Sequence, residues 1–363
     1  MSFLAFSAIV TNHTAKLLAR CLERAPNQAL VTYSDIAYIA FGHRSRIFVS
    51  MLFSIELLAA CVALVVLFAD SLHALVPSVS VLGWKIIAGF VLTPLSFLPL
   101  RVLSFSSVLG IFSTVSIFLI VFANGLLKPD YPGSLRSPAP THLFPTNWNT
   151  VALSIGLLMS PWGGHSVFPN IFKDMRHPEK YNRAVNITYW FTYLLDASMM
   201  VVGFLMFGDT VMDEITANIL SLPFYPAAGK VIMTVFIAII PLTKTPLNAR
   251  PIITTLEILC GVDARGMTPL ARGMTKIAVR VFANVVFVLV AIVCPGFDRI
   301  MAFLGSALCV TICIVLPLLF HLKIFHGEIG RWETAMDWLL VIVSSVLAVV
   351  GTIASFMPKD TME

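Results

Sequence analysis

The segment 159–169, which reads MSPWGGHSVFP, has the composition of a membrane helix that is interrupted near its midpoint. Pro161 has no backbone N–H group to donate, and Pro169 repeats this defect at the far end of the segment. Gly163 and Gly164 between them relax the backbone. A continuous helix would not have this composition in the middle of a membrane. We therefore expect a discontinuous helix, with a simple proline kink filled by neighbouring helices as the alternative.

A break at this point would expose backbone groups of both signs. Carbonyl groups become available near residues 158–160, and N–H groups near residues 164–167. The N-terminus of the second half-helix suits a substrate carboxylate, and the carbonyls that end the first half suit an ammonium group or a cation. These two poles match a zwitterionic amino acid. The candidate substrate-binding residues are Ser160, Gly163, Gly164, His165 and Ser166.

His165 is the one titratable side chain in this segment. Imidazole can change its charge near neutral pH, so His165 could gate a coupled proton. The same residue could equally be a packing histidine whose hydrogen bonds are satisfied among the helices. The sequence leaves both interpretations open.

Two carboxylates lie deep inside apolar runs. Glu56 is about ten residues, and therefore about 15 Å, into the run 47–69, too deep for its side chain to reach either interface. A charged carboxylate at that depth costs on the order of 3 kcal/mol on insertion scales. Glu56 must therefore face protein, water or a cation, or stay protonated. Asp196 lies near the midpoint of the run 185–207, and the same argument applies to it. Both are candidates for proton coupling, with a hydrogen-bonded structural acid as the alternative.

The chain as a whole has the composition of a membrane protein. Of its 363 residues, 58% are hydrophobic and 12% are charged, and the mean hydropathy is +0.89. A soluble domain carries a charge on about a quarter of its residues, so the apolar surplus must face lipid. The net charge of +5 comes from basic residues scattered among the loops, so nucleic acid is not an expected partner.

Ten apolar runs follow one another along a single domain, residues 1–363. At about 20 residues per crossing, this length accommodates about ten spans. The runs are predicted to be helices, because barrel strands need only about ten residues. The predicted fold class is an all-α polytopic membrane protein. The runs are 3–19, 47–69, 81–98, 104–127, 149–170, 185–207, 228–248, 276–294, 299–322 and 335–356.

Loop charges orient these helices, because cytosolic loops carry an excess of Lys and Arg. One set of alternate loops holds sixteen basic residues, and the opposite set with its adjacent helix ends holds six. The first set is therefore predicted to be cytosolic, and the Pro-rich segment 128–148 to be an external loop. The sixteen are Arg20, Arg24, Arg44, Arg46, Arg101, Lys173, Arg176, Lys180, Arg183, Arg250, Arg265, Arg272, Lys276, Arg280, Lys323 and Arg331. The six are Lys85, Lys128, Arg136, Lys230, Arg299 and Lys359.

This orientation puts both chain ends on the non-cytosolic side. The first run begins almost at Met1, is short, and enters the membrane with no preceding anchor. We expect a further helix upstream of Met1, with an even-spanned protein whose two ends lie outside as the alternative.

Four segments resemble the amino acid/auxin permease family, and most of all its vacuolar amino acid and vesicular inhibitory-transmitter branch. The segment 32–42, TYSDIAYIAFG, is similar to the loop after the family's second helix. The segment 94–113 is similar to its fourth-to-fifth helix junction, and 239–252, IIPLTKTPLNARPI, to its eighth helix. The most specific match is 156–181, GLLMSPWGGHSVFPNIFKDMRHPEKY, which resembles the sixth helix and the loop that follows.

The resemblance implies eleven helices, a cytosolic N-terminus and a LeuT-like fold of two inverted five-helix repeats. The ten runs then match helices two to eleven, and the first helix of the family has no counterpart. The resemblance also bears on Lys244, which lies between Pro241 and Pro246 and matches the family's Pro-x-x-Lys pattern. Lys244 could place an ammonium group where sodium-coupled relatives hold a cation, or its side chain could snorkel to the surface. It is the third candidate for proton coupling.

These features predict a secondary transporter that moves neutral amino acids by alternating access, driven by a proton gradient rather than by sodium. Substrate would bind between the runs 149–170, 47–69 and 228–248, in a vacuolar or other acidic-compartment membrane. Symport and antiport both remain open. The alternatives are a non-transporting amino acid sensor of the same fold and an inactive truncated isoform.

No enzymatic activity is predicted, because no G-x-S-x-G, H-E-x-x-H or P-loop pattern occurs. The six cysteines do not form a C-x-x-C pair, so no metal site is expected. The expected partners are the amino acid substrate and the lipid bilayer, with no cofactor and no obligate protein partner.

Overall fold

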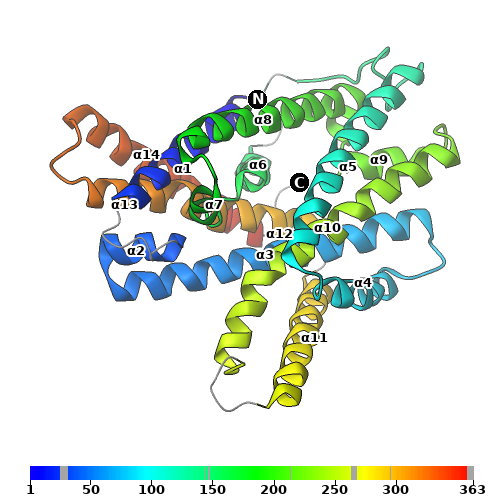
Figure 1. Cartoon of the computed structure of the whole chain (residues 1–363). Helices are drawn as coiled ribbons and strands as arrows, with labels where there is room; N and C mark the ends of the chain where they lie inside the picture. The colour runs from blue at the N-terminus through cyan, green and yellow to red at the C-terminus, as the bar shows by residue number, and fades with distance from the viewer. Residues whose placement is uncertain are drawn as a thin grey trace. The chain divides into compact units, whose positions relative to one another are not determined.

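The computed structural model describes residues 1–24, 32–142, 144–145, 148–212, 214–262, 268–294 and 296–357 (Figure 1). Arg265 and Lys359, which enter the predicted charge balance of the loops, lie outside these ranges. The chain divides into two compact units, and each is assembled from separate stretches of sequence. Unit 1 contains Met1–Glu56, Phe144–Ala197 and Asp298–Glu363, and unit 2 contains Leu57–Leu143 and Ser198–Phe297.

Helices dominate the described residues, and no β-strand occurs among them (Figure 1). One helix contains two π-helical segments, η4 (Leu304–Cys309) and η5 (Thr311–Val315). Short 3-10 turns are η1 (Ser160–Trp162), η2 (Pro178–Lys180) and η3 (Gly208–Thr210). The α-helices are α1 (Ser2–Glu23), α2 (Tyr33–Phe41), α3 (His43–Leu75), α4 (Val81–Leu95), α5 (Leu100–Leu127), α6 (Asn149–Met159), α7 (Phe168–Asp174), α8 (Tyr181–Phe207), α9 (Ile215–Ser221), α10 (Ala227–Leu259), α11 (Pro269–Val293), α12 (Phe297–Phe303), α13 (Leu316–Ile324) and α14 (Arg331–Phe356).

Seven helical stretches of the described chain are long and apolar enough to cross a membrane, where the sequence predicted ten. The other three runs do form helices, namely α1, α4 and α6. The helix α1 carries Asn12, His13 and Lys16 in its middle, α4 has 15 residues, and α6 has 11. The predicted count of ten spans is therefore not confirmed by length and apolar composition. The seven stretches are His43–Leu75, Phe105–Leu127, Pro178–Thr210, Ala227–Leu259, Pro269–Val293, Phe297–Ile324 and Arg331–Phe356.

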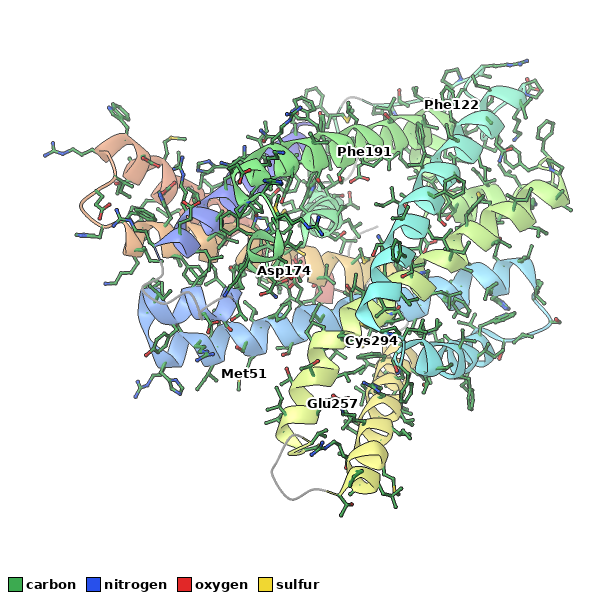
Figure 2. The ribbon with its side chains drawn as sticks, viewed as in Figure 1. Met51, Phe122, Asp174, Phe191, Glu257 and Cys294 are labelled. Carbon is green, nitrogen blue, oxygen red and sulfur yellow. The ribbon has the colours of Figure 1, made fainter. Side chains whose placement is uncertain are left out.

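Large apolar side chains cover the outward surfaces of these helices (Figure 2). The exposed fractions are 62% for Met51, 39% for Phe122 and 49% for Phe191. Water does not tolerate so much exposed apolar surface, whereas lipid does, and the pattern fits a protein whose solvent is the bilayer.

The segment 32–42, expected as a loop, forms the helix α2. Thr32 and Asp35 make a reciprocal capping box at its start, and Gly42 ends it with a φ of 85°. Arg46 pairs with the buried Asp35 at 2.9 Å and fixes the turn into α3. The capping pattern T-x-x-D favours this helix, although the resemblance pointed to a loop.

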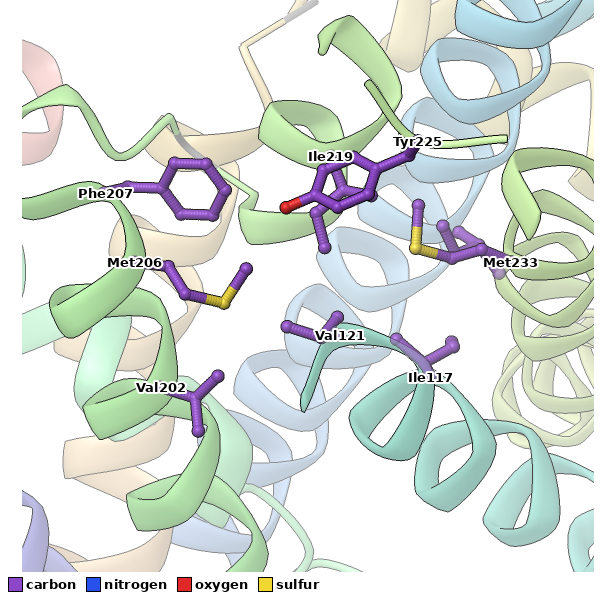
Figure 3. Packing of buried hydrophobic residues seen from close by; sticks show 9 residues of the cluster. Ile117, Val121, Val202, Met206, Phe207, Ile219, Tyr225 and Met233 are labelled. Carbon is purple, nitrogen blue, oxygen red and sulfur yellow. The ribbon is translucent and has the colours of Figure 1, made fainter. Parts of the chain in front are cut away.

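The hydrophobic core of unit 2 joins α5, α8, α9 and α10 (Figure 3). Met206 of α8, Val121 of α5 and Ile219 of α9 are among its buried members. The predicted external loop is attached to this unit over residues 133–139. The backbone N–H of Gly133 donates to Met206 at 2.7 Å, and that of Ala139 donates to Leu205 at 2.8 Å.

In unit 1 the helix α6 approaches η4 at backbone contact distance. A methyl group on Gly305 would lie 1.8 Å from the carbonyl oxygen of Gly156, and one on Gly156 would lie 2.2 Å from that of Ala302. A methyl group on Gly351 of α14 would lie 2.7 Å from Cβ of Ser306 in η4 and 3.4 Å from the carbonyl oxygen of Ala152 in α6. Small residues allow membrane helices to pack this closely. This packing places η4 directly beside the end of α6.

Candidate functional site

The predicted break occurs at the end of α6. The α-helix stops at Met159, the turn η1 follows, and residues 163–167 are non-helical until α7 begins at Phe168. Pro161 leaves the carbonyl of Leu157 without its usual helical donor, and the Ser160 hydroxyl donates to that oxygen at 2.9 Å. The discontinuous helix predicted from the sequence is therefore the local structure observed.

The turn across the break satisfies some of the backbone groups that the sequence suggested would be free. The N–H of Val167 donates to the carbonyl of Gly164 at 3.1 Å, and the N–H of Phe168 donates to that of His165 at 3.3 Å. Val167 is therefore removed from the expected set of available donors. Neither Gly163 nor Gly164 has a positive φ, so backbone relaxation is not the reason for two glycines here.

Gly163 is required by close packing against a buried carboxylic acid and a thiol. A methyl group at Gly163 would lie 2.8 Å from Sγ of Cys309 and 3.5 Å from Oε1 of Glu56. The Cys309 thiol lies 3.9 Å from Oε1 of Glu56 and 4.0 Å from the carbonyl oxygen of Ser160. Ser166, also buried, is close enough to interact with the same carboxyl group. Glu56 thus lies directly on the break, and 6% of it is exposed.

His165 links the break to α1. Its ring is fully buried, and Nε2 lies 3.0 Å from the carbonyl oxygen of Thr11 and 3.0 Å from the hydroxyl of Thr14. The Thr14 hydroxyl donates to the carbonyl of Cys313 at 2.6 Å. Because the Thr11 carbonyl can only accept, Nε2 carries a proton in this arrangement. On its Nε2 side, His165 is therefore a packing histidine whose hydrogen-bonding capacity is satisfied.

We predict that His165→Ala destabilises the protein by about 1–3 kcal/mol, because it removes a buried donor and leaves the Thr11 carbonyl with one partner fewer. His165→Gln, whose amide can donate from a similar position, should recover most of this loss. Thermal unfolding in detergent measures both effects. Wild-type stability in His165→Ala would contradict the linking role. A pH profile altered by His165→Gln would favour a titrating histidine instead.

The π-helical segment beside the break also presents free carbonyls. Pro317 lies four residues after Cys313 and five after Ile312, so the α-helical and π-helical donor for these carbonyls is missing. Thr14 of α1 donates to Cys313, as above, and the Tyr33 hydroxyl of α2 donates to Ile312 at 2.6 Å. Two side chains from the first part of the chain therefore satisfy the backbone of the irregular helix.

The structure brings together Ser160, Gly163, Gly164, His165, Ser166 and Glu56, and it adds residues that sequence reasoning did not select. Thr14, Cys309 and Cys313 are the additions. The sequence does contain a signal for the two cysteines, because Cys309, Cys313 and Pro317 follow one another at intervals of four residues. Among the described residues, no group of three or more His, Cys, Asp or Glu side chains could hold a metal ion.

The other two predicted residues belong to α8 and α10. Asp196 is partly buried on α8 in unit 1. Lys244 is exposed on α10 in unit 2, between the buried Thr243 and Thr245.

Residues 1–357 match the family described as transmembrane amino acid transporter protein. The chain belongs to this family. Its members are membrane transporters rather than enzymes, and the chain is accordingly a multi-pass integral membrane protein. The amino acid/auxin permease resemblance read from the sequence is confirmed.

Individual relatives of this family match almost the whole chain. It is 32% identical to amino acid transporter AVT1E of Arabidopsis thaliana, over 96% of this chain and 66% of the relative. It is 29% identical to amino acid transporter AVT1D of the same plant, over 97% of this chain and 63% of the relative. The vesicular GABA transporter of Caenorhabditis elegans is 24% identical, over 96% of this chain and 71% of its own length. The chain thus spans less than two thirds of the length of the two plant transporters.

Proposed function

We propose that the chain carries neutral amino acids across a membrane by proton-coupled alternating access. The observation that carries this proposal is the break after Met159, where a buried carboxyl group and a thiol meet the backbone of residues 160–163 inside an apolar helical unit. Membership of a transmembrane amino acid transporter family supports the same substrate class.

The two sides of the break suit the two charges of an amino acid. The carbonyl of Ser160 and the carboxyl of Glu56 lie on one side, where they would accept hydrogen bonds from a substrate ammonium group. The N–H groups of His165 and Ser166, in the turn that follows Gly164, would instead donate to the substrate carboxylate. The helix α7 has seven residues, so the turn itself rather than a long helix dipole would bind the carboxylate.

Glu56 is proposed to couple transport to protons. A carboxylate that is 6% exposed and 3.9 Å from a thiol is stable as a charge only with a cation or a substrate ammonium beside it, and otherwise favours the protonated form. Binding and release of substrate would then be linked to loss and gain of a proton. Asp196 and Lys244 are proposed as further members of this pathway within a LeuT-like five-plus-five fold.

The direct test is flux through proteoliposomes that contain the full chain. With an acidic lumen, a labelled neutral amino acid should accumulate or exchange, and a protonophore should abolish this movement. Replacing sodium with potassium should leave the flux unchanged. Saturable binding without flux would instead identify a sensor, and neither binding nor flux would overturn the proposed function. The resemblance of four segments to the vacuolar and vesicular branch of the family makes an acidic compartment the natural location to examine in cells.

We predict that Glu56→Gln removes the pH dependence of flux and reduces coupled accumulation by at least about tenfold, because glutamine keeps the shape but cannot exchange a proton. The measurement is initial flux between pH 5 and 8 with and without an imposed gradient. Glu179→Gln, an exposed acid in unit 1, is the matched control and should keep the wild-type profile. An unchanged profile in Glu56→Gln would remove this residue from the coupling scheme.

A further inference from the structure

An open groove lies between α13 and α14 in unit 1. Its volume is about 640 Å³, and it is lined from α13, the connection to α14, α14 itself and the last residue of α2. We refer to this space as the α13–α14 groove. It does not include Glu56 or any residue at the helix break.

The polar lining of the groove is basic. Lys323, His326 and Arg331 line it, and all three are exposed. Lys323 and Arg331 form no ion pair with any residue in the described part of the chain. The nearby acids are directed to α1: Glu328 pairs with Arg24, and Glu333 lies 4.0 Å from Arg20. The two cations in the groove are therefore available to an anion from outside.

The rest of the lining is apolar and of membrane-interface character. Leu319 and Leu322 come from α13, Ile329 from the connection, and Trp338 from α14 with 49% of it exposed. Trp332, next to Arg331, is 87% exposed. Tryptophan is enriched at the level of lipid headgroups, so this end of α14 is placed at the membrane–water interface. The groove thus combines basic and apolar side chains in one lining.

A buried contact links the two helices that line the groove. The buried His321 of α13 lies 2.8 Å from the carboxylate of Asp337 of α14, and both side chains are at most 3% exposed. Nε2 of the same ring lies 4.0 Å from Glu333. The contact between His321 and Asp337 therefore ties α13 to α14.

We propose that the α13–α14 groove binds one anionic phospholipid. The phosphate would contact Lys323 and Arg331, and an acyl chain would lie along Leu319 and Trp338. Charge complementarity together with the apolar wall selects a lipid over a soluble anion, because a free phosphate would gain nothing from the apolar part. Both cations belong to the loops predicted to be cytosolic. Anionic lipids concentrate in the cytosolic leaflet, so the groove would face the leaflet that contains them. Binding here stands independently of transport.

The test titrates purified full-length protein in a neutral detergent with a short-chain phosphatidylserine or phosphatidylinositol, and follows thermal unfolding. Anionic lipid should raise the unfolding temperature in a saturable manner, and phosphatidylcholine at the same concentration should not. The double variant Lys323→Gln/Arg331→Gln should raise the apparent Kd for the anionic lipid by about tenfold to thirtyfold, which is the loss of affinity expected for two basic contacts. Because both side chains are exposed, this double variant should have the wild-type unfolding temperature when no anionic lipid is present.

The matched control is Arg176→Gln/Lys180→Gln, which removes two exposed charges from another part of unit 1 outside the groove. It should keep the wild-type affinity. Ala335→Phe, which fills the groove and leaves every charge in place, should weaken lipid binding as well. Equal affinities for the two double variants would overturn the site in favour of diffuse charge attraction. An equal stabilisation by inorganic phosphate or a soluble inositol phosphate would overturn the lipid assignment.

Discussion

Replacing Gly163 with alanine is expected to reduce amino acid flux by about 100-fold, while replacing Gly164 with alanine should leave it close to the wild-type value. The added methyl group at Gly163 would lie 2.8 Å from Sγ of Cys309, so the break must move away from the thiol and from Glu56. A displacement of about 1 Å at a binding site is enough for a loss of this size. At Gly164 the nearest atom to such a methyl group is a ring carbon of Phe168 at 3.5 Å, which is an ordinary contact.

The measurement is initial flux in proteoliposomes at equal amounts of inserted protein, with size-exclusion profiles as the check on folding. Cys309→Ala in combination with Gly163→Ala makes room for the methyl group and should restore part of the flux. Full activity of Gly163→Ala, or equal losses at both glycines, would contradict the assignment of Gly163 as the close-packed position.

Gly164→Leu, unlike Gly164→Ala, is expected to impair transport, because leucine is much larger than the space beside Phe168. The alanine pair is the sharper test, since only the structure distinguishes the two neighbouring glycines.

Replacing Gly305 with alanine is expected to prevent stable folding of unit 1. Its methyl group would lie 1.8 Å from the carbonyl oxygen of Gly156, and a backbone atom cannot rotate away as a side chain can. Overpacking of this kind costs about 3 kcal/mol or more, a large part of the stability of a typical domain. The helix α6 and the π-helical segment η4 would have to separate, and the contact between Cys309 and the break would be lost with them.

Thermal unfolding and the monodisperse fraction after purification measure this effect. Gly156→Ala should behave like Gly305→Ala, because its methyl group would meet the carbonyl of Ala302 at 2.2 Å. Gly273→Ala is the control, since no atom lies within 4 Å of the added methyl group and the position is inside α11. This variant should be neutral or slightly stabilised. A Gly305→Ala protein with wild-type stability would show that the close approach is not as the structure describes it.

Local physical chemistry made several features of this protein predictable from its sequence. Hydropathy gave the membrane class and the order of the helices, because long apolar runs have no other solvent than lipid. Pro161 predicted the break near Met159, because a missing N–H group is a property of one residue. The depth of Glu56 in its run predicted that its side chain reaches neither membrane interface, and in the structure 6% of the residue is exposed. Four segments carried the family resemblance, and the match over residues 1–357 confirms it.

The tertiary structure decided which of these features meet. Glu56 and Cys309 are 253 positions apart in the chain, and Thr14 and His165 are 151 apart, so no local pattern relates them. Hydrophobic periodicity identifies a buried face but not the face against which it packs. The cysteines were set aside because their spacing matches no metal or disulfide pattern, and their role as packing partners depends on the π-helical turn before Pro317. The family of the protein and its local backbone geometry can be predicted from short segments of the sequence. The set of residues that forms the site depends on contacts that exist only once distant helices have packed.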